Sequence, residues 1–242
     1  MRMVPGLALV LACVTGCAID TDDEESQDTG ASADAVQSGD SAGRATMLPE
    51  AVQILHDNGR DFCTGVLVSA RVAITAAHCI GGKTWTVRAS NAPGTPSAVA
   101  RKADVVSWKF DDSPAVRDAA VLVLDTPIAL EHYAVMTDIG GQADAGKTFE
   151  GVAVGRAKQT RLGALVRTKT IPITSGKKDG YTTGLRTPYY SGGGDSGGPL
   201  FLVRDGKITH ELVGIERQPE PARNADYFTR VDGTLRALVA KY

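Results

Sequence analysis

The chain has 242 residues, of which 43% are hydrophobic, so it is long enough to bury a sizeable core. Its formal net charge is −2, and it contains no basic block of the kind that nucleic-acid binding requires, so we expect no nucleic-acid partner. The 27 glycines favour an all-β protein with many tight turns.

Residues 1–17 predict an export signal. A short positive start precedes an apolar stretch at residues 4–14, which is well short of the ~20 residues of a membrane-spanning helix. Val14-Thr15-Gly16-Cys17 resembles a bacterial lipobox, in which Cys17 would be lipidated and become the first mature residue. The alternative is a plain secretory signal cleaved near Ala18. Both predict export, as an outer-membrane lipoprotein or a secreted protein, with a lipid anchor as the only membrane contact.

Residues 18–46 predict an acidic, disordered tether or propeptide. They hold eight acidic residues and one basic residue, and they contain no aromatic side chain. Such a segment cannot bury enough apolar surface to fold by itself. We therefore expect the folded domain to occupy residues 47–242.

Cys63 and Cys79 are the only cysteines of the expected folded domain, because Cys13 and Cys17 belong to the signal. An exported protein meets oxidising conditions, so we expect these two to form a disulfide bond. Two cysteines beside one histidine, with no second cluster of ligands, make a poor zinc pattern. We expect no metal and no cofactor.

His78 follows two predicted strands, at residues 66–68 and 72–74, that are rich in β-forming residues. The expected disulfide at Cys79 would fix the position of the imidazole, which catalysis needs and a surface histidine does not. Three further histidines lack such support, and we interpret them as ordinary polar residues: His56, His132 and His210.

Ser196 lies in a glycine-rich turn, Gly192 to Pro199, that is suited to a nucleophile. Glycines reach positive φ without steric cost and leave backbone N–H groups free to face a substrate. If Ser196 attacks a carbonyl group, the N–H groups of Gly194 and Ser196 are placed to bind the oxyanion. The same sequence would also suit an ordinary polar loop. A catalytic role for Ser196 therefore requires a general base and an orienting acid elsewhere in the chain.

The run Thr75-Ala76-Ala77-His78-Cys79, followed later by Gly193 to Pro199, resembles the trypsin/chymotrypsin family of serine proteases. The resemblance covers residues 47–242 and implies two packed six-stranded antiparallel Greek-key barrels with a C-terminal helix. The helix has support of its own, because apolar residues recur on one helical face. These residues are Val231, Leu235, Leu238, Val239 and Tyr242.

That family needs an aspartate between the histidine and the serine, and Asp118 supplies it at the start of an apolar strand. By resemblance, Ser196 attacks the scissile carbonyl, His78 moves the proton, and Asp118 orients the imidazole. The implied function is a monomeric serine endopeptidase that hydrolyses proteins or peptides through an acyl-enzyme. The alternative is a non-catalytic binding protein on the same fold. The order His78, Asp118, Ser196 excludes an α/β-hydrolase.

The expected substrate pocket departs from the family. Tyr190 stands where an aspartate selects basic side chains, and we expect it to fill or shorten a pocket that Ser191 also lines. If Arg217 or Arg223 faced this pocket, an acidic substrate side chain would be attractive.

Asp195 presents a second departure, because the family's freed α-amino group, which pairs with this aspartate, has no recognisable counterpart. One hypothesis is cleavage after Arg44, which would create a new N-terminus at Ala45 and release the domain from its anchor. The rival is an internal lysine or arginine partner with no activation step, since a buried Asp195 without compensation would be costly.

Overall fold

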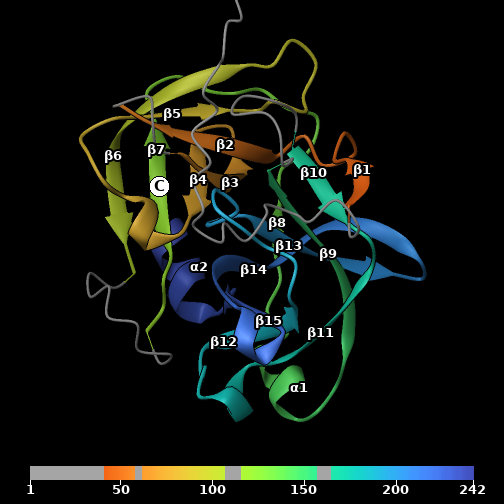
Figure 1. Ribbon diagram of the computed structural model, residues 1–242. Helices are drawn as coiled ribbons and strands as arrows, with labels where there is room; N and C mark the ends of the chain where they lie inside the picture. Colours follow the sequence, from red (N-terminus) through yellow and green to blue (C-terminus); the bar gives the residue numbers. More distant parts are fainter. Residues whose placement is uncertain (1–40, 58–61, 107–115, 157–164) are drawn as a thin grey trace, which may run out of the picture. The chain divides into compact units, whose positions relative to one another are not determined.

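The computed structural model describes residues 41–57, 62–106, 116–156 and 165–242, which form two β-barrels (Figure 1). The predicted export signal, Cys17 and most of the predicted tether lie outside these residues. The prediction of two six-stranded antiparallel barrels is confirmed. Among the described residues, no helix is long and apolar enough to cross a membrane.

The first barrel closes in the order β2, β3, β4, β7, β6 and β5, and its nonsequential step from β4 to β7 is a Greek-key connection. Its strands are β2 (Ala51–His56), β3 (Phe62–Ser69), β4 (Val72–Thr75), β5 (Trp85–Arg88), β6 (Ser97–Val105) and β7 (Ala120–Leu124). The 3-10 helix η1 (Ala77–Cys79) follows β4 directly.

The second barrel runs from β9 through β11, β12, β15, β14 and β13, and β13 pairs with β9 to close it. Its strands are β9 (Phe149–Arg156), β11 (Ile171–Ser175), β12 (Gly184–Pro188), β13 (Pro199–Arg204), β14 (Lys207–Glu220) and β15 (Ala225–Arg230). Further elements are β8 (Val135–Met136), β10 (Leu165–Thr168), α1 (Gly140–Asp144), η2 (Lys177–Asp179) and η3 (Pro221–Arg223).

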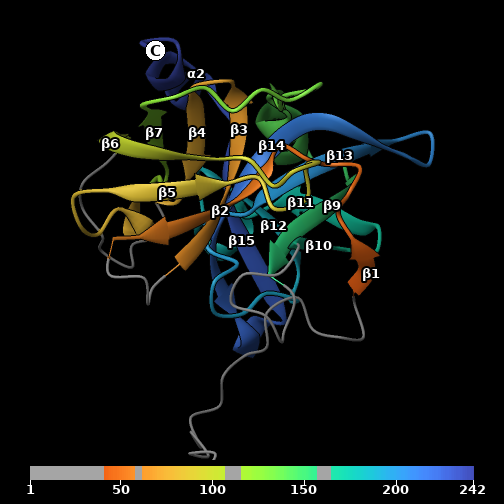
Figure 2. The same cartoon turned by 90° about the horizontal axis from the view of Figure 1, so that it is seen from above.

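Apolar side chains from both barrels form one shared cluster. Val66 and Ile74 come from the first barrel, and Phe201 and Ile215 from the second, and all four are fully buried. This shared core packs the two barrels against each other. Figures 1 and 2 show the strands of the barrels from two directions. Loops that leave either barrel at this junction are therefore held at defined positions.

The C-terminal helix α2 (Gly233–Val239) is shorter than the apolar pattern suggests. Asp232 caps its start by accepting the N–H groups of Thr234 and Leu235, which ends the preceding extended backbone. Leu235 is fully buried, whereas Tyr242 lies beyond the helix and is exposed. The prediction of a C-terminal helix that packs one face on the barrels is confirmed.

Residues 41–44, which the sequence assigns to the tether, form strand β1 (Ser41–Arg44) at the edge of the second barrel's sheet. β1 pairs with β10, and the following residue, Ala45, is fully buried and donates its N–H to the carbonyl of Leu165 at 3.0 Å. Composition failed to indicate this strand because backbone pairing, which residue types do not reveal, places it there.

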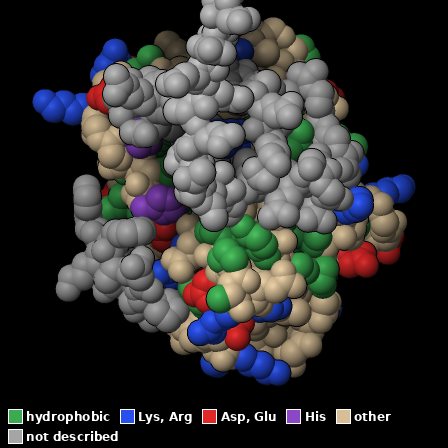
Figure 3. Space-filling model, viewed as in Figure 1, with side chains coloured by type: hydrophobic (Ala, Val, Ile, Leu, Met, Phe, Trp, Pro, Cys, Tyr) green, Lys and Arg blue, Asp and Glu red, His purple; other side chains and the backbone are tan. Residues whose placement is uncertain are grey.

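On the face shown in Figure 3, the basic side chains of the described residues are scattered among acidic ones and do not form one patch.

Candidate active site

His78 and Asp118 are joined by two hydrogen bonds. The imidazole Nδ1 of His78 lies 2.6 Å from Oδ2 of Asp118, and the His78 backbone N–H donates to Oδ1 at 3.0 Å. β4 and β7 are antiparallel neighbours, with Thr75 opposite Ala120. The residues after β4, which include His78, therefore lie at the same edge of the barrel as the residues before β7, which include Asp118. This edge places the predicted base beside the predicted acid.

Asp118 is 5% exposed, so a carboxylate there needs hydrogen bonds in place of water. Thr229 of β15 provides a further link, since its hydroxyl accepts the Asp118 N–H at 3.0 Å and donates to the Asp118 carbonyl at 3.1 Å. A residue of the second barrel thus helps to hold a site residue of the first.

The predicted disulfide between Cys63 and Cys79 is confirmed. It ties η1, which carries His78, to β3. Among the described residues, one group of three potential metal ligands has its ligand atoms within 4.8 Å of one another, and it comprises Cys63, His78 and Cys79. Both sulfurs are consumed by the disulfide, so this group offers no thiolate to a metal ion.

Ser196 is brought to the same place by Thr64 of β3. The Thr64 N–H donates to the Ser196 carbonyl at 2.8 Å, and the Thr64 hydroxyl donates to the Gly194 carbonyl, also at 2.8 Å. The Ser196 carbonyl oxygen is 3.8 Å from Sγ of Cys79, the residue after His78. Ser196 and Gly194 are both partly exposed, as a nucleophile and an oxyanion-binding N–H must be.

Two glycines allow this turn to form. Gly194 has φ +93° and Gly197 has φ +81°, in the left-handed region that L side chains rarely adopt. A Cβ atom on Gly197 would collide with the Thr75 hydroxyl and the Thr64 carbonyl, and it would lie 2.8 Å from the Ala76 nitrogen. The turn can therefore approach β3 and β4 this closely only because residue 197 is glycine.

Asp195 is 1% exposed and is held by backbone N–H groups. Its Oδ1 accepts from the Arg156 N–H at 2.6 Å and its Oδ2 from the Gly192 N–H at 2.9 Å. Ala45, the proposed new N-terminus, is instead bonded to Leu165 next to β1. At least two backbone N–H groups of the intact chain thus stabilise the Asp195 carboxylate.

Tyr190 and Ser191, the two expected pocket residues, are both buried. The Tyr190 ring lies in the core of the second barrel, 6.3 Å from the ring of Phe228. The backbone N–H groups of Tyr190 and Ser191 donate to Oδ2 of Asp226 at 2.6 and 3.0 Å. The Ser191 hydroxyl donates to Oδ1 of Asp226 at 2.7 Å and lies 3.2 Å from Oε1 of Glu216.

Glu216 and Asp226 are therefore part of the site's support, and sequence reasoning missed this. Burial raises the pKa of Asp226 to about 6, and burial together with neighbouring carboxylates raises the pKa of Glu216 well above its usual range. Glu216 directly precedes Arg217, which the sequence had suggested as a pocket residue, but no motif signals Asp226.

The arginines that were considered as pocket residues contact other groups. The Arg217 guanidinium donates to the Val116 carbonyl at 3.0 Å and lies 5.3 Å from the centre of the Tyr181 ring. Arg223 is half exposed and pairs with Glu220 at 2.8 Å. The charged groups in contact with Ser191 that the structure shows are carboxylates, which argues against an acidic substrate side chain there.

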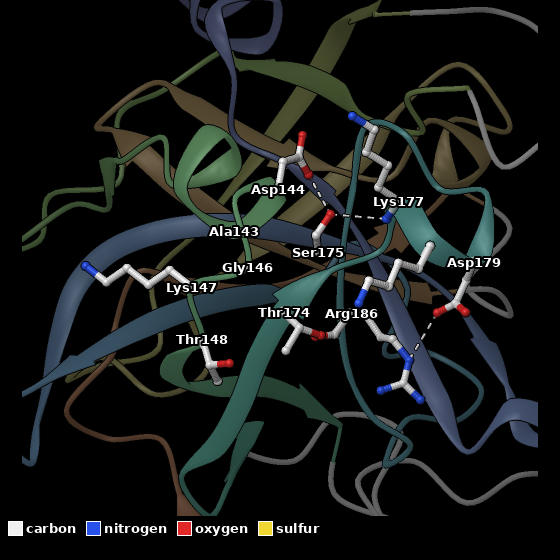
Figure 4. A pocket seen from close by; sticks show the side chains of 11 residues that line it. Ala143, Asp144, Gly146, Lys147, Thr148, Thr174, Ser175, Lys177, Asp179 and Arg186 are labelled. Carbon is white, nitrogen blue, oxygen red and sulfur yellow. Dashed lines mark hydrogen bonds and ion pairs between the residues drawn. The ribbon is translucent and has the colours of Figure 1, made fainter.

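A separate hollow of about 820 Å³ lies between α1 and the β11–β12 region (Figure 4). None of the predicted catalytic residues lines it. Its two carboxylates are engaged, because Asp144 pairs with Arg230 at 3.1 Å and Asp179 with Arg186 at 3.2 Å. We therefore place the chemistry at the junction of the barrels.

A histidine bonded to a buried aspartate beside a serine turn, at the junction of two six-stranded barrels, defines the class of trypsin-like serine proteases. The comparisons agree, because the family model described as Trypsin matches residues 37–238. The chain belongs to this family.

A curated relative, serine protease 56 of Mus musculus, is 29% identical over 178 residues. The match covers 64% of this chain, which spans only 30% of the length of the mouse protein.

Solved structures share the fold. The human heparin binding protein has a TM-score of 0.64 at 21% identity, covering 84% of this chain and 96% of the other. A scabies mite inactivated protease paralogue, S-D1, has a TM-score of 0.62 at 21% identity, with 84% and 94% covered.

Proposed function

We propose that this chain is a serine endopeptidase in which His78, Asp118 and Ser196 form the catalytic triad. The observation that carries the proposal is the 2.6 Å contact between Nδ1 of His78 and Oδ2 of the buried Asp118. In the tautomer that donates its Nδ1–H to Asp118, Nε2 of His78 carries the lone pair and can accept a proton from a nucleophile.

The proposed reaction forms and then hydrolyses an acyl-enzyme. Ser196 Oγ attacks the scissile carbonyl carbon as its proton passes to Nε2 of His78, and the N–H groups of Gly194 and Ser196 stabilise the oxyanion. His78 then protonates the leaving amine as the peptide C–N bond breaks. Water repeats the sequence and releases the acid. Asp118 stabilises the imidazolium at both stages.

The proposed setting is outside the cytoplasm, with a protein or peptide as the substrate and a monomer as the working unit. The disulfide between Cys63 and Cys79 supports export, since such bonds persist in oxidising compartments. We propose that residues 1–17 are the signal and that Cys17 is lipidated, with a plainly secreted protein as the alternative. Mass spectrometry of the mature N-terminus distinguishes the two.

A non-catalytic binding protein is the second candidate. It is favoured by the burial of Tyr190, Ser191, Glu216 and Asp226, which restricts the region where a substrate side chain would enter. The fold alone does not decide the matter, since inactivated protease paralogues share it.

Covalent labelling separates the two candidates. An active serine protease reacts with a fluorophosphonate probe at Ser196, and the Ser196→Ala variant does not. Ser97→Ala, which alters an exposed serine of β6, is the matched control and should label like the parent. If the correctly oxidised parent fails to label, the binding protein is favoured.

A further inference from the structure

His132 and His210 are far apart in the sequence, but their rings lie side by side. The ring centroids are 4.9 Å apart and the planes are inclined by 34°. His132 belongs to the connection between β7 and β8, and His210 belongs to β14. The parallel pairing of β8 with β14, with Val135 opposite Glu211, keeps the two segments together.

A buried carboxylate supports this pair. Oε1 of Glu50 lies 2.6 Å from Nδ1 of His210, and the Glu50 side chain is 0% exposed. Its second oxygen, Oε2, has no hydrogen-bond partner among the described residues. When it is ionised, this carboxylate accepts a hydrogen bond from Nδ1–H of His210, which orients the ring and leaves the lone pair on Nε2.

His132 also lies near a carboxylate, but this one is exposed. Its Nε2 lies 3.5 Å from Oε1 of Glu131, whose side chain is 87% exposed and can move aside for a ligand. The His132 and His210 side chains are 54% and 34% exposed, so an ion can reach both of them from solvent. A carboxylate behind an imidazole is the usual outer-shell partner of a metal-binding histidine.

The spacing of the rings fits one shared ion. Zinc binds an imidazole nitrogen at about 2.0–2.1 Å, so two rings that share one ion at a tetrahedral angle have centres about 5 Å apart. We propose that His132 and His210 together bind one divalent transition-metal ion, Zn²⁺ in the first instance, with Glu50 as the outer-shell carboxylate. Water completes the coordination.

This site is distinct from the proposed catalytic centre. Thr64, near one end of β3, bonds to Ser196, whereas Leu67, three residues further along, bonds to the Glu50 carbonyl and to Ala134. At ~3.3 Å per residue, these points are about 10 Å apart along the strand. The ion would join the connection between the barrels to β14, so its binding should stabilise the fold.

Titration calorimetry with ZnCl₂ on the full, untagged chain tests the proposal. All proteins carry His78→Ala, because the proposed catalytic histidine could bind zinc independently. We expect one site with a dissociation constant in the micromolar range, and His132→Ala and His210→Ala should each weaken it at least about tenfold. Glu50→Gln should weaken it about 10- to 100-fold if the carboxylate acts as an outer-shell partner. His56→Ala is the matched control and should bind like the parent.

Thermal unfolding provides a readout that does not depend on activity. Zinc should raise the Tm of the parent and of the His56→Ala variant, because a ligand that binds only the folded state stabilises it. This increase should vanish in the His132→Ala and His210→Ala variants, whose unliganded Tm shows whether they fold. Absence of saturable binding by the parent, or unchanged binding by both variants, would overturn the proposal.

Discussion

The Ser191 hydroxyl donates to Oδ1 of Asp226 at 2.7 Å, so a carboxylate from β15 holds the segment that precedes the proposed nucleophile. The same hydroxyl lies 3.2 Å from Oε1 of Glu216 on the neighbouring strand β14. The two acids and the serine are all buried. The turn that carries Ser196 is thus supported on one side by Thr64 of the first barrel and on the other by acids of the second.

Replacement of Asp118 tests the proposed triad. Asp118→Asn keeps the side-chain volume but cannot hold the imidazole in the same tautomer, so kcat should fall by about 10⁴-fold. Hydrolysis of a peptide library by parent and variant measures the change. Asp125→Asn is the matched control. Asp125 is an exposed acid that follows the last residue of β7, so its substitution should leave kcat unchanged. Equal activity of Asp118→Asn and parent would contradict the triad.

The Gly197→Ala substitution tests the close approach of the turn to β3 and β4. The new Cβ would meet Thr75 and Thr64 at a positive φ, so the free energy of unfolding should fall by more than the ~1 kcal/mol expected for φ strain alone. Gly206→Ala isolates that strain, since Gly206 has φ +72° and nothing within 4 Å of its Cβ position. Urea unfolding of both variants measures the difference. Equal losses would show that the turn has room to move.

The motifs around His78 and Ser196 could be predicted because the residues that define them are neighbours in the sequence. The contacts that support them could not. Ser191, Glu216 and Asp226 come from three separate segments, and no sequence pattern around any of them indicates that they contact one another. The same holds for His132 and His210. The pairing of β8 with β14 brings their rings together, and the sequence does not reveal this pairing, so both were interpreted as ordinary polar residues.

Some elements of the fold could be predicted from the sequence, and others could not. Runs of β-forming residues indicated individual strands at residues 66–68 and 72–74, but the closure of two barrels was implied by family resemblance. β1 could not be predicted, because the sequence 41–44 is short and polar and its place depends on backbone pairing with β10. The sequence could not indicate which groups stabilise the buried Asp195 carboxylate. Two of them are backbone N–H groups, which residue types do not reveal.

The Glu216→Gln substitution tests the buried acids through the pH dependence of stability. The pKa of Glu216 is raised in the folded state, so its contribution to stability is fully present below the unfolded value of about 4.5 and is lost as pH rises through the folded pKa. The substituted glutamine side chain cannot ionise. The variant should therefore be more stable than the parent at pH 8, and its stability should depend less on pH above about 4.5.

Urea unfolding between pH 4 and pH 8 measures this difference. Glu211→Gln provides a control with the opposite pH dependence. Arg204 lowers the pKa of Glu211, so the contribution of Glu211 to the free energy of unfolding is lost as pH falls. As a partly exposed pair, it should change stability by no more than about 1 kcal/mol. Parallel pH profiles for the parent and Glu216→Gln would mean that Glu216 is ionised in the folded protein.

The Arg44→Ala substitution decides between the two accounts of Asp195. Cleavage after Arg44 would require this bond to leave β1, where Arg44 pairs with Val166 and the next N–H is bonded to Leu165. Since Asp195 already accepts two backbone N–H groups in the intact chain, we expect the variant to label with the fluorophosphonate probe as fully as the parent. Sequencing from the N-terminus of the labelled protein should show that the chain begins before residue 44 and that residue 44 is still joined to Ala45. An Arg44→Ala protein that folds, keeps its disulfide and fails to label, while the labelled parent begins at Ala45, would establish activation by cleavage instead.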